Sequence, residues 1–331
     1  MFNDLRLDWT ARVESVEEQE GKVESGIRPI RTRGRLASGS FCRTTGERVS
    51  NVSLSCDGPD IGYPYELLEK IGTGAMGDIW RAHDMKLMRD VAIKVAHGSL
   101  GAESPFDEAR LAARAEHPNV VRIYDVGLTR SGTSYLVMEL LTGEDLEARL
   151  ARKPGPVDSD EAVQLAIELL SGLDAVHGAK VVHRDIKPSN VFLSEVGDQT
   201  VVKLLDFGVA CQRRREQGGL AAGTPMYMAP EQLLAGARAS VSTDIYSVGV
   251  LLFQLIFGQN LSRVHWAHAS MYEIAQSRDV SPLKTCCDPA LAFIIECALA
   301  ENPGERFSSA REFRQALMDW RGPASGCRQR G

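Results

Sequence analysis

The sequence has no apolar run long enough to cross a lipid bilayer. The longest candidate, VGVLLFQLIF at 248–257, has about half of the roughly 20 residues that a spanning helix needs, and it contains Gln254. The opening segment, MFNDLRLDWTARVESVEEQE, mixes acidic and basic residues and lacks an apolar core, so neither a secretory signal nor a transit peptide is predicted. We therefore expect a cytoplasmic protein with no membrane span.

Cysteine pairs with redox or metal-binding spacing are also missing. The seven cysteines form no C-x-x-C pair, and their odd number favours reduced thiols over disulfides or a zinc site. An excess of positive charge is missing too, because 38 Lys and Arg stand against 44 Asp and Glu, a net charge of −6. This balance argues against a protein that binds the phosphate groups of nucleic acids, because such binding depends on clustered Lys and Arg.

Regular patterns are absent from the two ends of the chain. Residues 1–60 have few aromatic residues and no sustained helical or strand period, so we predict a disordered N-terminal tail. Residues 322–331 are expected to form a short disordered C-terminus. The chain between them, residues 65–321, is long enough for two lobes with a core.

This folded part changes character along its length. Its first section contains β-branched and apolar runs that predict strands, and its later section contains apolar residues at helical spacing. The predicted strands are 71–82, 90–97, 120–128 and 134–141, and the predicted helices are 163–176, 244–257, 289–300 and 308–320. One early helix is expected from Ser104-Pro105 to a point before His117-Pro118. The order predicts an α+β fold with a small β-rich lobe, a larger helical lobe and a ligand cleft between them.

A glycine-rich segment begins the chemistry. Gly72, Gly74 and Gly77 form G-x-G-x-x-G, whose missing side chains let backbone amides approach phosphate oxygens. In a dinucleotide-binding oxidoreductase a helix follows this motif, whereas here the strand-forming Ile79 and Trp80 follow it. The sequence therefore favours a hairpin that covers a nucleotide.

A lysine on a predicted strand needs an anionic partner. Lys94 ends the apolar run Val91-Ala92-Ile93, and a partly buried ammonium group is costly without a counter-charge. Glu108 is the candidate, because on a helix from 105 to 115 it shares the inward face. Glu116 is the competing choice, at the end of that helix.

The densest polar cluster is VHRDIKPSN at 182–190, followed by an apolar strand at 201–205 and then DFG at 206–208. Asp185 offers a base, Lys187 a nearby cation, and Asn190 and Asp206 oxygen ligands for Mg²⁺. Phosphoryl transfer needs this combination, since it depends on positioning and on neutralising charge.

These motifs together resemble those of a known family. IGTGAMGDI, VAIK, HRDIKPSN, DFG, GTPMYMAPE and DIYSVG occur in the order found in eukaryotic-type (Hanks-type) serine/threonine protein kinases, and the sequence looks like a bacterial member. The resemblance covers about residues 65–321. It implies the two-lobed kinase fold, with an N-lobe at 65–139 and a C-lobe at 140–321.

The resemblance also implies roles and cofactors. Asp185 would be the catalytic base and Lys187 would steady the transferred group of ATP, while Asn190 and Asp206 would hold Mg²⁺. Lys94 would contact the phosphates, paired with Glu108. The implied nucleotide contacts are Ile71, Gly72, Thr73, Gly74, Ala75, Met76, Gly77, Asp78, Ile79, Lys94, Glu139 and Leu141.

Further family positions concern the framework. Met138 would lie at the back of the adenine pocket, and Glu139 to Leu141 would form the hinge. Glu231 would pair with Arg306 as a structural bridge. Asp244 would brace the catalytic loop.

The expected substrates are serine or threonine residues of proteins. Lys187 lies two residues after the base and Thr224 lies in GTPMYMAPE, as in serine/threonine kinases. Self-association for autophosphorylation stays open. The main alternative is a catalytically weak, pseudokinase-like scaffold, although such a protein would normally have lost Lys94, Asp185 or Asp206.

One segment departs from the family pattern. Between Gly208 and Gly223 the chain reads VACQRRREQGGLAA, with no Ser, Thr or Tyr. Our hypothesis is that this activation segment is ordered without phosphorylation, by Glu216 facing Arg184 or by a partner protein. A second hypothesis concerns Ser38 in RTRGRLAS, which resembles the target of a basophilic kinase. It would make the tail a substrate in cis or an autoinhibitory segment, and the alternative is a plain disordered tail.

Overall fold

The computed structural model describes residues 58–74, 77–97, 113–206, 225–233, 239–258 and 282–322. All of them belong to one compact unit, Leu54–Gly331. Several expectations fall outside the described residues. They concern the tail at 1–57, Ala75 and Met76 of the glycine-rich segment, and most of the early helix with Glu108. The activation segment and Thr224 also fall outside them.

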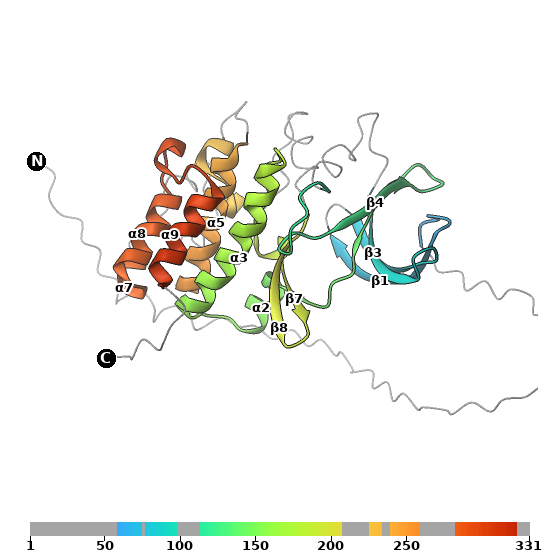
Figure 1. Ribbon diagram of the computed structural model, residues 1–331, viewed down its shortest axis with the longest axis horizontal. Coiled ribbons are helices and arrows are strands. Elements are labelled where there is room, and N and C mark those ends of the chain that lie inside the picture. The colour runs from blue at the N-terminus through green and yellow to red at the C-terminus, as the bar shows by residue number, and fades with distance from the viewer. Residues whose placement is uncertain are drawn as a thin grey trace, which may run out of the picture. The chain divides into compact units, whose positions relative to one another are not determined.

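The first part of this unit is a five-stranded antiparallel sheet (Figure 1). Its strands are β1 (Tyr65–Gly74), β2 (Gly77–Asp84), β3 (Arg89–Ala96), β4 (Ile123–Leu128) and β5 (Ser134–Glu139), in the order β1-β2-β3-β5-β4. Along β3 the side chains alternate between the two faces, as the strand period of two requires. Val91 and Ile93 are buried in one apolar cluster, and Ala92 is buried in another. Lys94 is on the same face as Ala92, which is the face toward the helical part.

A second, smaller sheet follows the connection after β5. It contains β6 (Gly143–Asp145), β7 (Val191–Val196) and β8 (Gln199–Leu204), antiparallel and in the order β6-β7-β8. The short 3-10 helix η1 (Pro188–Asn190) leads directly into β7. This sheet therefore carries HRDIKPSN before one strand and Asp206 after another.

The rest of the unit is helical. The helices are α2 (Leu146–Arg152), α3 (Ser159–Gly178), α5 (Val241–Phe257), α7 (Leu283–Cys286), α8 (Pro289–Ala298) and α9 (Ala310–Arg321), with short turns η2 (Pro225–Tyr227), η3 (Pro230–Leu233) and η4 (Pro303–Glu305). Figure 1 shows α3, α5, α8 and α9 packed together. The helices expected at 163–176, 244–257, 289–300 and 308–320 are confirmed by α3, α5, α8 and α9. Helix α5 is buried on nearly all sides, which explains its almost unbroken apolar sequence.

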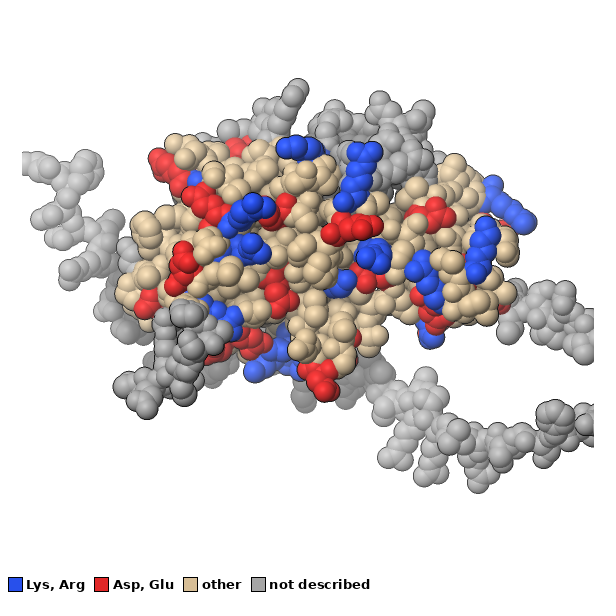
Figure 2. Space-filling view, viewed as in Figure 1, with Lys and Arg blue, Asp and Glu red and all other residues tan. Residues whose placement is uncertain are grey.

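Two surface properties agree with the composition. None of the helices in the described ranges is both long and apolar enough to cross a membrane. On the face drawn in Figure 2, Lys and Arg are interspersed with Asp and Glu among the described residues.

Candidate active site

A cavity of about 530 Å³ lies between the five-stranded sheet and the smaller sheet of β6, β7 and β8. We call the smaller sheet the catalytic sheet, because HRDIKPSN and Asp206 flank its strands. Residues from both sheets and from the connection between them line it. They are Ile71, Gly72, Thr73, Gly74, Gly77, Ile79, Ala92, Lys94, Val121, Met138, Glu139, Leu140, Leu141, Asp145, Glu147, Asp185, Lys187, Ser189, Asn190, Phe192, Leu205 and Asp206. Most residues that the sequence analysis selected are therefore brought together in one place.

The HRDIKPSN segment folds back on its own aspartate. Lys187 Nζ donates to Asp185 Oδ2 at 2.8 Å, and Asn190 Nδ2 donates to the same oxygen at 2.9 Å. Asn190 Nδ2 also donates to the backbone oxygen of Asp185 at 2.7 Å. Pro188 begins the short helix η1, which suits a residue with no amide hydrogen to donate. This turn fixes the direction of the Asp185 carboxylate.

A buried carboxylate from α5 braces the same segment from behind. Asp244 is 1% exposed, and its two oxygens accept from the backbone amides of His183 and Arg184, each at 2.8 Å. Arg184 has a φ of 71°, a conformation that non-glycine residues seldom adopt. His183 Nε2 donates to the Leu205 carbonyl at 2.7 Å. The expectation that Asp244 braces the catalytic loop is confirmed.

Lys94 reaches across the cavity. Its ammonium donates to Asp206 Oδ2 at 2.5 Å, and the two side chains are 18% and 31% exposed. Glu108, the partner that the sequence analysis selected, lies outside the described residues. Within the described part of the chain, the counter-charge of Lys94 is therefore Asp206. Leu205, just before it, donates its amide to the Asn190 carbonyl at 2.9 Å, so the lysine's partner is tied to the catalytic loop.

Asp78, selected as a nucleotide contact, does not line the cavity. Its Oδ1 lies 2.9 Å from Lys70 Nζ and 3.2 Å from His97 Nε2. The hydrogen bond from Lys70 lowers the pKa of this carboxyl group, and a second from His97 acts in the same direction. Asp78 on β2 thus contacts Lys70 of β1 and His97, the residue that follows β3.

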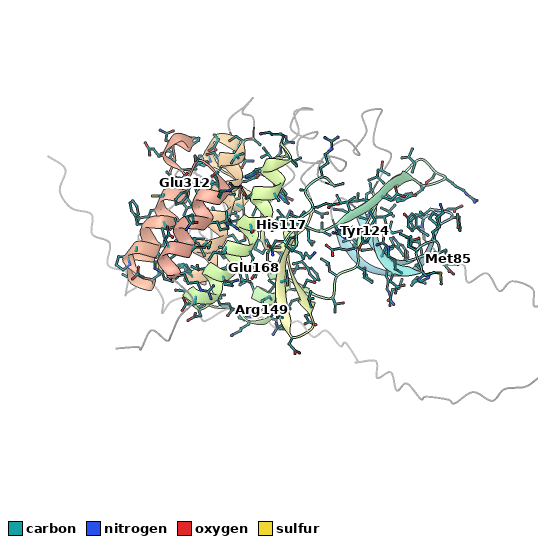
Figure 3. All side chains as sticks on the ribbon, viewed as in Figure 1. Met85, His117, Tyr124, Arg149, Glu168 and Glu312 are labelled. Atoms are coloured by element: carbon teal, nitrogen blue, oxygen red, sulfur yellow. The ribbon has the colours of Figure 1, made fainter. Side chains whose placement is uncertain are left out.

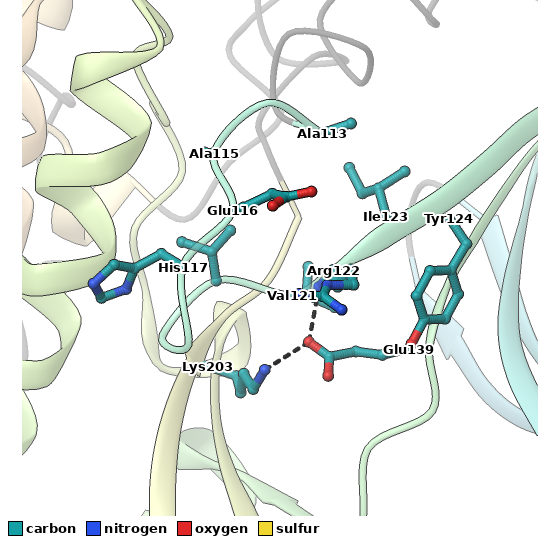
Figure 4. A pocket seen from close by; sticks show the side chains of 11 residues that line it. Ala113, Ala115, Glu116, His117, Val121, Arg122, Ile123, Tyr124, Glu139 and Lys203 are labelled. Carbon is teal, nitrogen blue, oxygen red and sulfur yellow. Dashed lines mark hydrogen bonds and ion pairs between the residues drawn. The ribbon is translucent and has the colours of Figure 1, made fainter.

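Glu139 lines the cavity, but its carboxylate points to the rear of the connection between the lobes (Figure 4). Its Oε1 accepts from Lys203 Nζ at 2.7 Å and from the Arg122 backbone amide at 2.8 Å. A second cavity, of about 510 Å³, opens around this pair. The side chain of Glu139 therefore joins β5 to β8, which leaves only its backbone for a ligand in the first cavity.

Several lining residues were missed by sequence reasoning. Ala92 could have been found, since it lies two positions before Lys94 on the same strand face. Val121, Phe192 and Leu205 reach the cavity through the pairing of segments far apart in sequence, for which the sequence has no local signal.

The framework pair Glu231 and Arg306 is present as expected. Arg306 donates to the two carboxylate oxygens at 2.7 and 2.8 Å, and its side chain is 0% exposed. The same guanidinium also donates to the backbone oxygens of Ala300, Ser242 and Glu301. The pair links η3 to the turn before α9.

The donor atoms near Asp185 suit a hard cation. Asp206 brings a carboxylate, and Asn190 brings an amide oxygen, since its nitrogen is used by Asp185. Oxygen donors of this kind are the ligands of Mg²⁺, which usually takes one or two protein groups together with phosphates. Among the described residues no cluster of three or more His, Cys, Asp or Glu could hold a metal alone. The two oxygen donors of Asn190 and Asp206 thus fit a Mg²⁺ ion that takes its remaining ligands from other groups.

Comparison with known sequences finds relatives that are named as kinases. The chain is 36% identical over 275 residues to serine/threonine-protein kinase PksC of Streptomyces coelicolor, an alignment covering 78% of this chain and 49% of PksC. It is 34% identical over 266 residues to PknA of Mycobacterium tuberculosis, covering 76% of this chain and 60% of PknA. The chain thus spans about half the length of the curated relatives it matches.

Solved structures and a family model agree on the domain. The kinase domain of Mycobacterium tuberculosis PknI matches with a TM-score of 0.59 at 25% identity, covering 76% of this chain and 94% of that domain. The model of the protein kinase domain matches residues 65–318. With the two-lobed fold and the motifs in their family order, the chain belongs to the protein kinase domain family.

Proposed function

We propose that the protein transfers the γ-phosphoryl group of ATP to serine and threonine hydroxyls of protein substrates. One observation carries the proposal: the hydrogen-bonded unit of Asp185, Lys187 and Asn190 shares a cavity with the Lys94–Asp206 pair. The relatives PksC and PknA, both named serine/threonine-protein kinases, support the same reaction.

Asp185 is assigned the role of catalytic base. Two donors hold its carboxylate from one side, so that the other oxygen is left for the substrate hydroxyl. The hydroxyl oxygen forms a bond to the γ-phosphorus, and the bond from that phosphorus to the β–γ bridging oxygen breaks. The hydroxyl proton goes to Asp185, and ADP leaves. Lys187, beside the base, is placed to steady the charge of the transferred group.

Asn190 and Asp206 are the residues that would hold Mg²⁺. The ion, when bound, neutralises negative charge on the phosphates. Lys94 now pairs with Asp206 at 2.5 Å, and in the nucleotide complex its ammonium would turn to the phosphates. Ala92, Val121, Met138 and Leu141 supply apolar walls for an adenine ring.

The test is phosphoryl transfer from labelled ATP and Mg²⁺ to a generic protein substrate, beside an Asp185→Asn variant. We expect kcat to fall by about 10²- to 10⁴-fold in the variant, the usual contribution of a general base. Nucleotide affinity should stay the same, because the amide keeps the size of the carboxylate. A wild-type protein that binds nucleotide but transfers no more label than Asp185→Asn would contradict the proposal and identify a pseudokinase-like scaffold.

Autophosphorylation between copies is the finer part of the proposal. Ser38, which Arg33 and Arg35 precede as in basophilic sites, is an acceptor within this chain that its own kinase domain or a second copy would reach. Wild-type enzyme mixed with Asp185→Asn protein should label the inactive copy. Absence of label in that copy, with generic substrate labelled normally, would exclude transfer between copies.

A further inference from the structure

Strand β8 lies at the edge of the catalytic sheet, since the strand order is β6-β7-β8. An edge strand presents every second backbone N–H and C=O away from its sheet, and buried groups of this kind are costly when unpaired. On β8 these groups belong to Val202 and Leu204, which are buried at 1% and 0% exposure. The strand leads within two residues to Asp206.

The four outward backbone groups of these two buried residues are all paired, and their partners do not belong to a further strand of the described sheet. The Val202 amide donates to Glu168 Oε2 at 2.9 Å, and Asn119 Nδ2 donates to the Val202 carbonyl at 2.8 Å. The Leu204 amide donates to the Asn119 carbonyl at 2.9 Å, and the Val121 amide donates to the Leu204 carbonyl at 3.0 Å. Two side chains, the Glu168 carboxylate from α3 and the Asn119 amide from the loop before β4, therefore complete the edge at Val202, and the backbone of that loop completes it at Leu204.

Both side chains are themselves held in place. Gln164 Nε2 donates to Glu168 Oε1 at 2.7 Å, one helical turn away on α3. The backbone amide of Asn119 donates to His117 Nδ1 at 3.1 Å, which holds the loop that carries the Asn119 side chain. A Cβ added at Gly172 of α3 would lie 2.6 Å from the Asn119 carbonyl oxygen, so the loop rests directly on the helix. Figure 3 shows His117 and Glu168 near this junction of helix, loop and sheet.

The pairing continues to the candidate metal ligand. After Leu204, the Leu205 amide donates to Asn190 and the Leu205 carbonyl accepts from His183. The N–H and C=O groups of Val202, Leu204 and Leu205 are therefore all hydrogen-bonded to a loop or helix outside β8. Asp206 is the first residue beyond this fixed stretch.

We propose that Glu168 and Asn119 are positioning residues for phosphoryl transfer. They complete the edge of β8 and so set the place of Asp206 relative to Asn190. The inference rests on the proposed kinase function, and neither residue lines the cavity, so their effect must pass through the strand. Because Asn119 lies on the loop that leads into β4, the same contacts also tie the N-lobe to β8.

The first experiment compares hydrogen exchange of the β8 amides in the purified chain of 331 residues. In Glu168→Ala the Val202 amide loses its acceptor, and we expect it to exchange about tenfold faster, as a local opening would allow. Glu168→Gln keeps an acceptor oxygen and should exchange like wild type. Glu161→Ala is the matched control, since it removes a carboxylate from the same helix that is hydrogen-bonded to Arg149 on α2 and not to β8.

The second measurement is the Mg²⁺ concentration that gives half-maximal binding of a non-hydrolysable ATP analogue. For Glu168→Ala and Asn119→Ala we expect this concentration to rise several-fold, about three- to tenfold, because a displaced Asp206 holds the cation less well. Binding of the analogue without Mg²⁺ should not change. If Glu168→Ala does not fold, Glu168→Asp withdraws the carboxylate from Val202 by one methylene and should show the same two changes in smaller degree.

Two results would overturn the inference. One is a Glu168→Ala or Glu168→Asp protein that melts at a lower temperature but retains wild-type β8 exchange and Mg²⁺ dependence, which would make the residue merely structural. The other is Glu168→Gln behaving like Glu168→Ala, which would deny the role of the hydrogen-bond acceptor. Neither readout needs turnover, so a wild-type protein that transfers no phosphate would defeat the proposed function and leave this inference to be judged on its own data.

Discussion

At Gly77 an added methyl group would lie 2.2 Å from the carbonyl oxygen of Val95 and 2.9 Å from its carbonyl carbon. These are backbone atoms of β3 and cannot turn away. At Gly74 the nearest atom to such a group is 3.6 Å away, and at Gly72 it is 3.7 Å away, both ordinary contacts. All three glycines line the cavity, but only the third is required by the packing of β2 on β3.

We predict that alanine lowers stability at Gly77 and weakens the use of ATP at Gly74. Gly77→Ala should lower the free energy of unfolding by about 1–3 kcal/mol, as overpacking does, because β2 must move away from β3. Gly74→Ala should change stability by less than about 0.5 kcal/mol but raise the KM for ATP, since the methyl group keeps phosphates from the backbone. Urea unfolding and ATP kinetics on both variants check this. Equal loss of stability in the two would show that the glycines share one role.

Among the elements, helices were easier to predict than the contacts that build the site. Helix α5 was expected from 244 but begins at Val241, and the missed signal was Ser240 and Thr243, which form a capping box. Strand β6, at Gly143–Asp145, is too short to show a period. The edge contacts of Asn119 arise only when loop, helix and strand meet. The sequence thus predicted the glycine-rich segment and the HRD and DFG positions, but it did not predict Asp206 as the counter-charge of Lys94 or the rear contacts of Glu139.

The pair of Arg306 and Glu231 is the clearest case of one buried contact that joins elements. Its guanidinium is fully enclosed, makes two bonds to the carboxylate and lies 4.7 Å from the centre of the Tyr246 ring. We predict that Arg306→Met lowers the free energy of unfolding by about 3 kcal/mol, since it leaves the Glu231 carboxylate, only 19% exposed, and three backbone oxygens without their donor. Denaturant unfolding of the apo protein measures this.

Arg311→Met is the matched control for that variant. Arg311 also donates twice to a carboxylate, Asp174, but its side chain is 74% exposed. Water and salt screen such a pair, so we expect a cost below about 1 kcal/mol. Should the two variants lose similar stability, burial would not be what makes the Arg306 pair strong.

At the scale of the whole described unit, two ion pairs connect the five-stranded sheet to the catalytic sheet. Lys94 and Asp206 meet in the cavity, and Glu139 and Lys203 meet behind the connection. A bound Mg-nucleotide would contact both Asp206 and Lys94, so the Lys94–Asp206 pair in the cavity, the front pair, would be replaced by ligand contacts. The Glu139–Lys203 pair, the rear pair, would remain. The nucleotide would then bridge the lobes that the front pair bridges in its absence.

This exchange predicts how ligand binding stabilises the molecule. A non-hydrolysable ATP analogue at about one hundred times its Kd should raise the free energy of unfolding by about 2.7 kcal/mol in the presence of Mg²⁺. In Asp206→Asn the part of this gain that depends on Mg²⁺ should vanish, because a neutral amide is a poorer ligand for Mg²⁺ than a carboxylate. The amide also no longer forms an ion pair with Lys94. Asp319→Asn, which changes an exposed carboxylate on α9, should keep the full gain. Thermal unfolding with and without Mg²⁺ measures both, and a Mg²⁺-dependent gain that survives in Asp206→Asn would mean that the cation is held elsewhere.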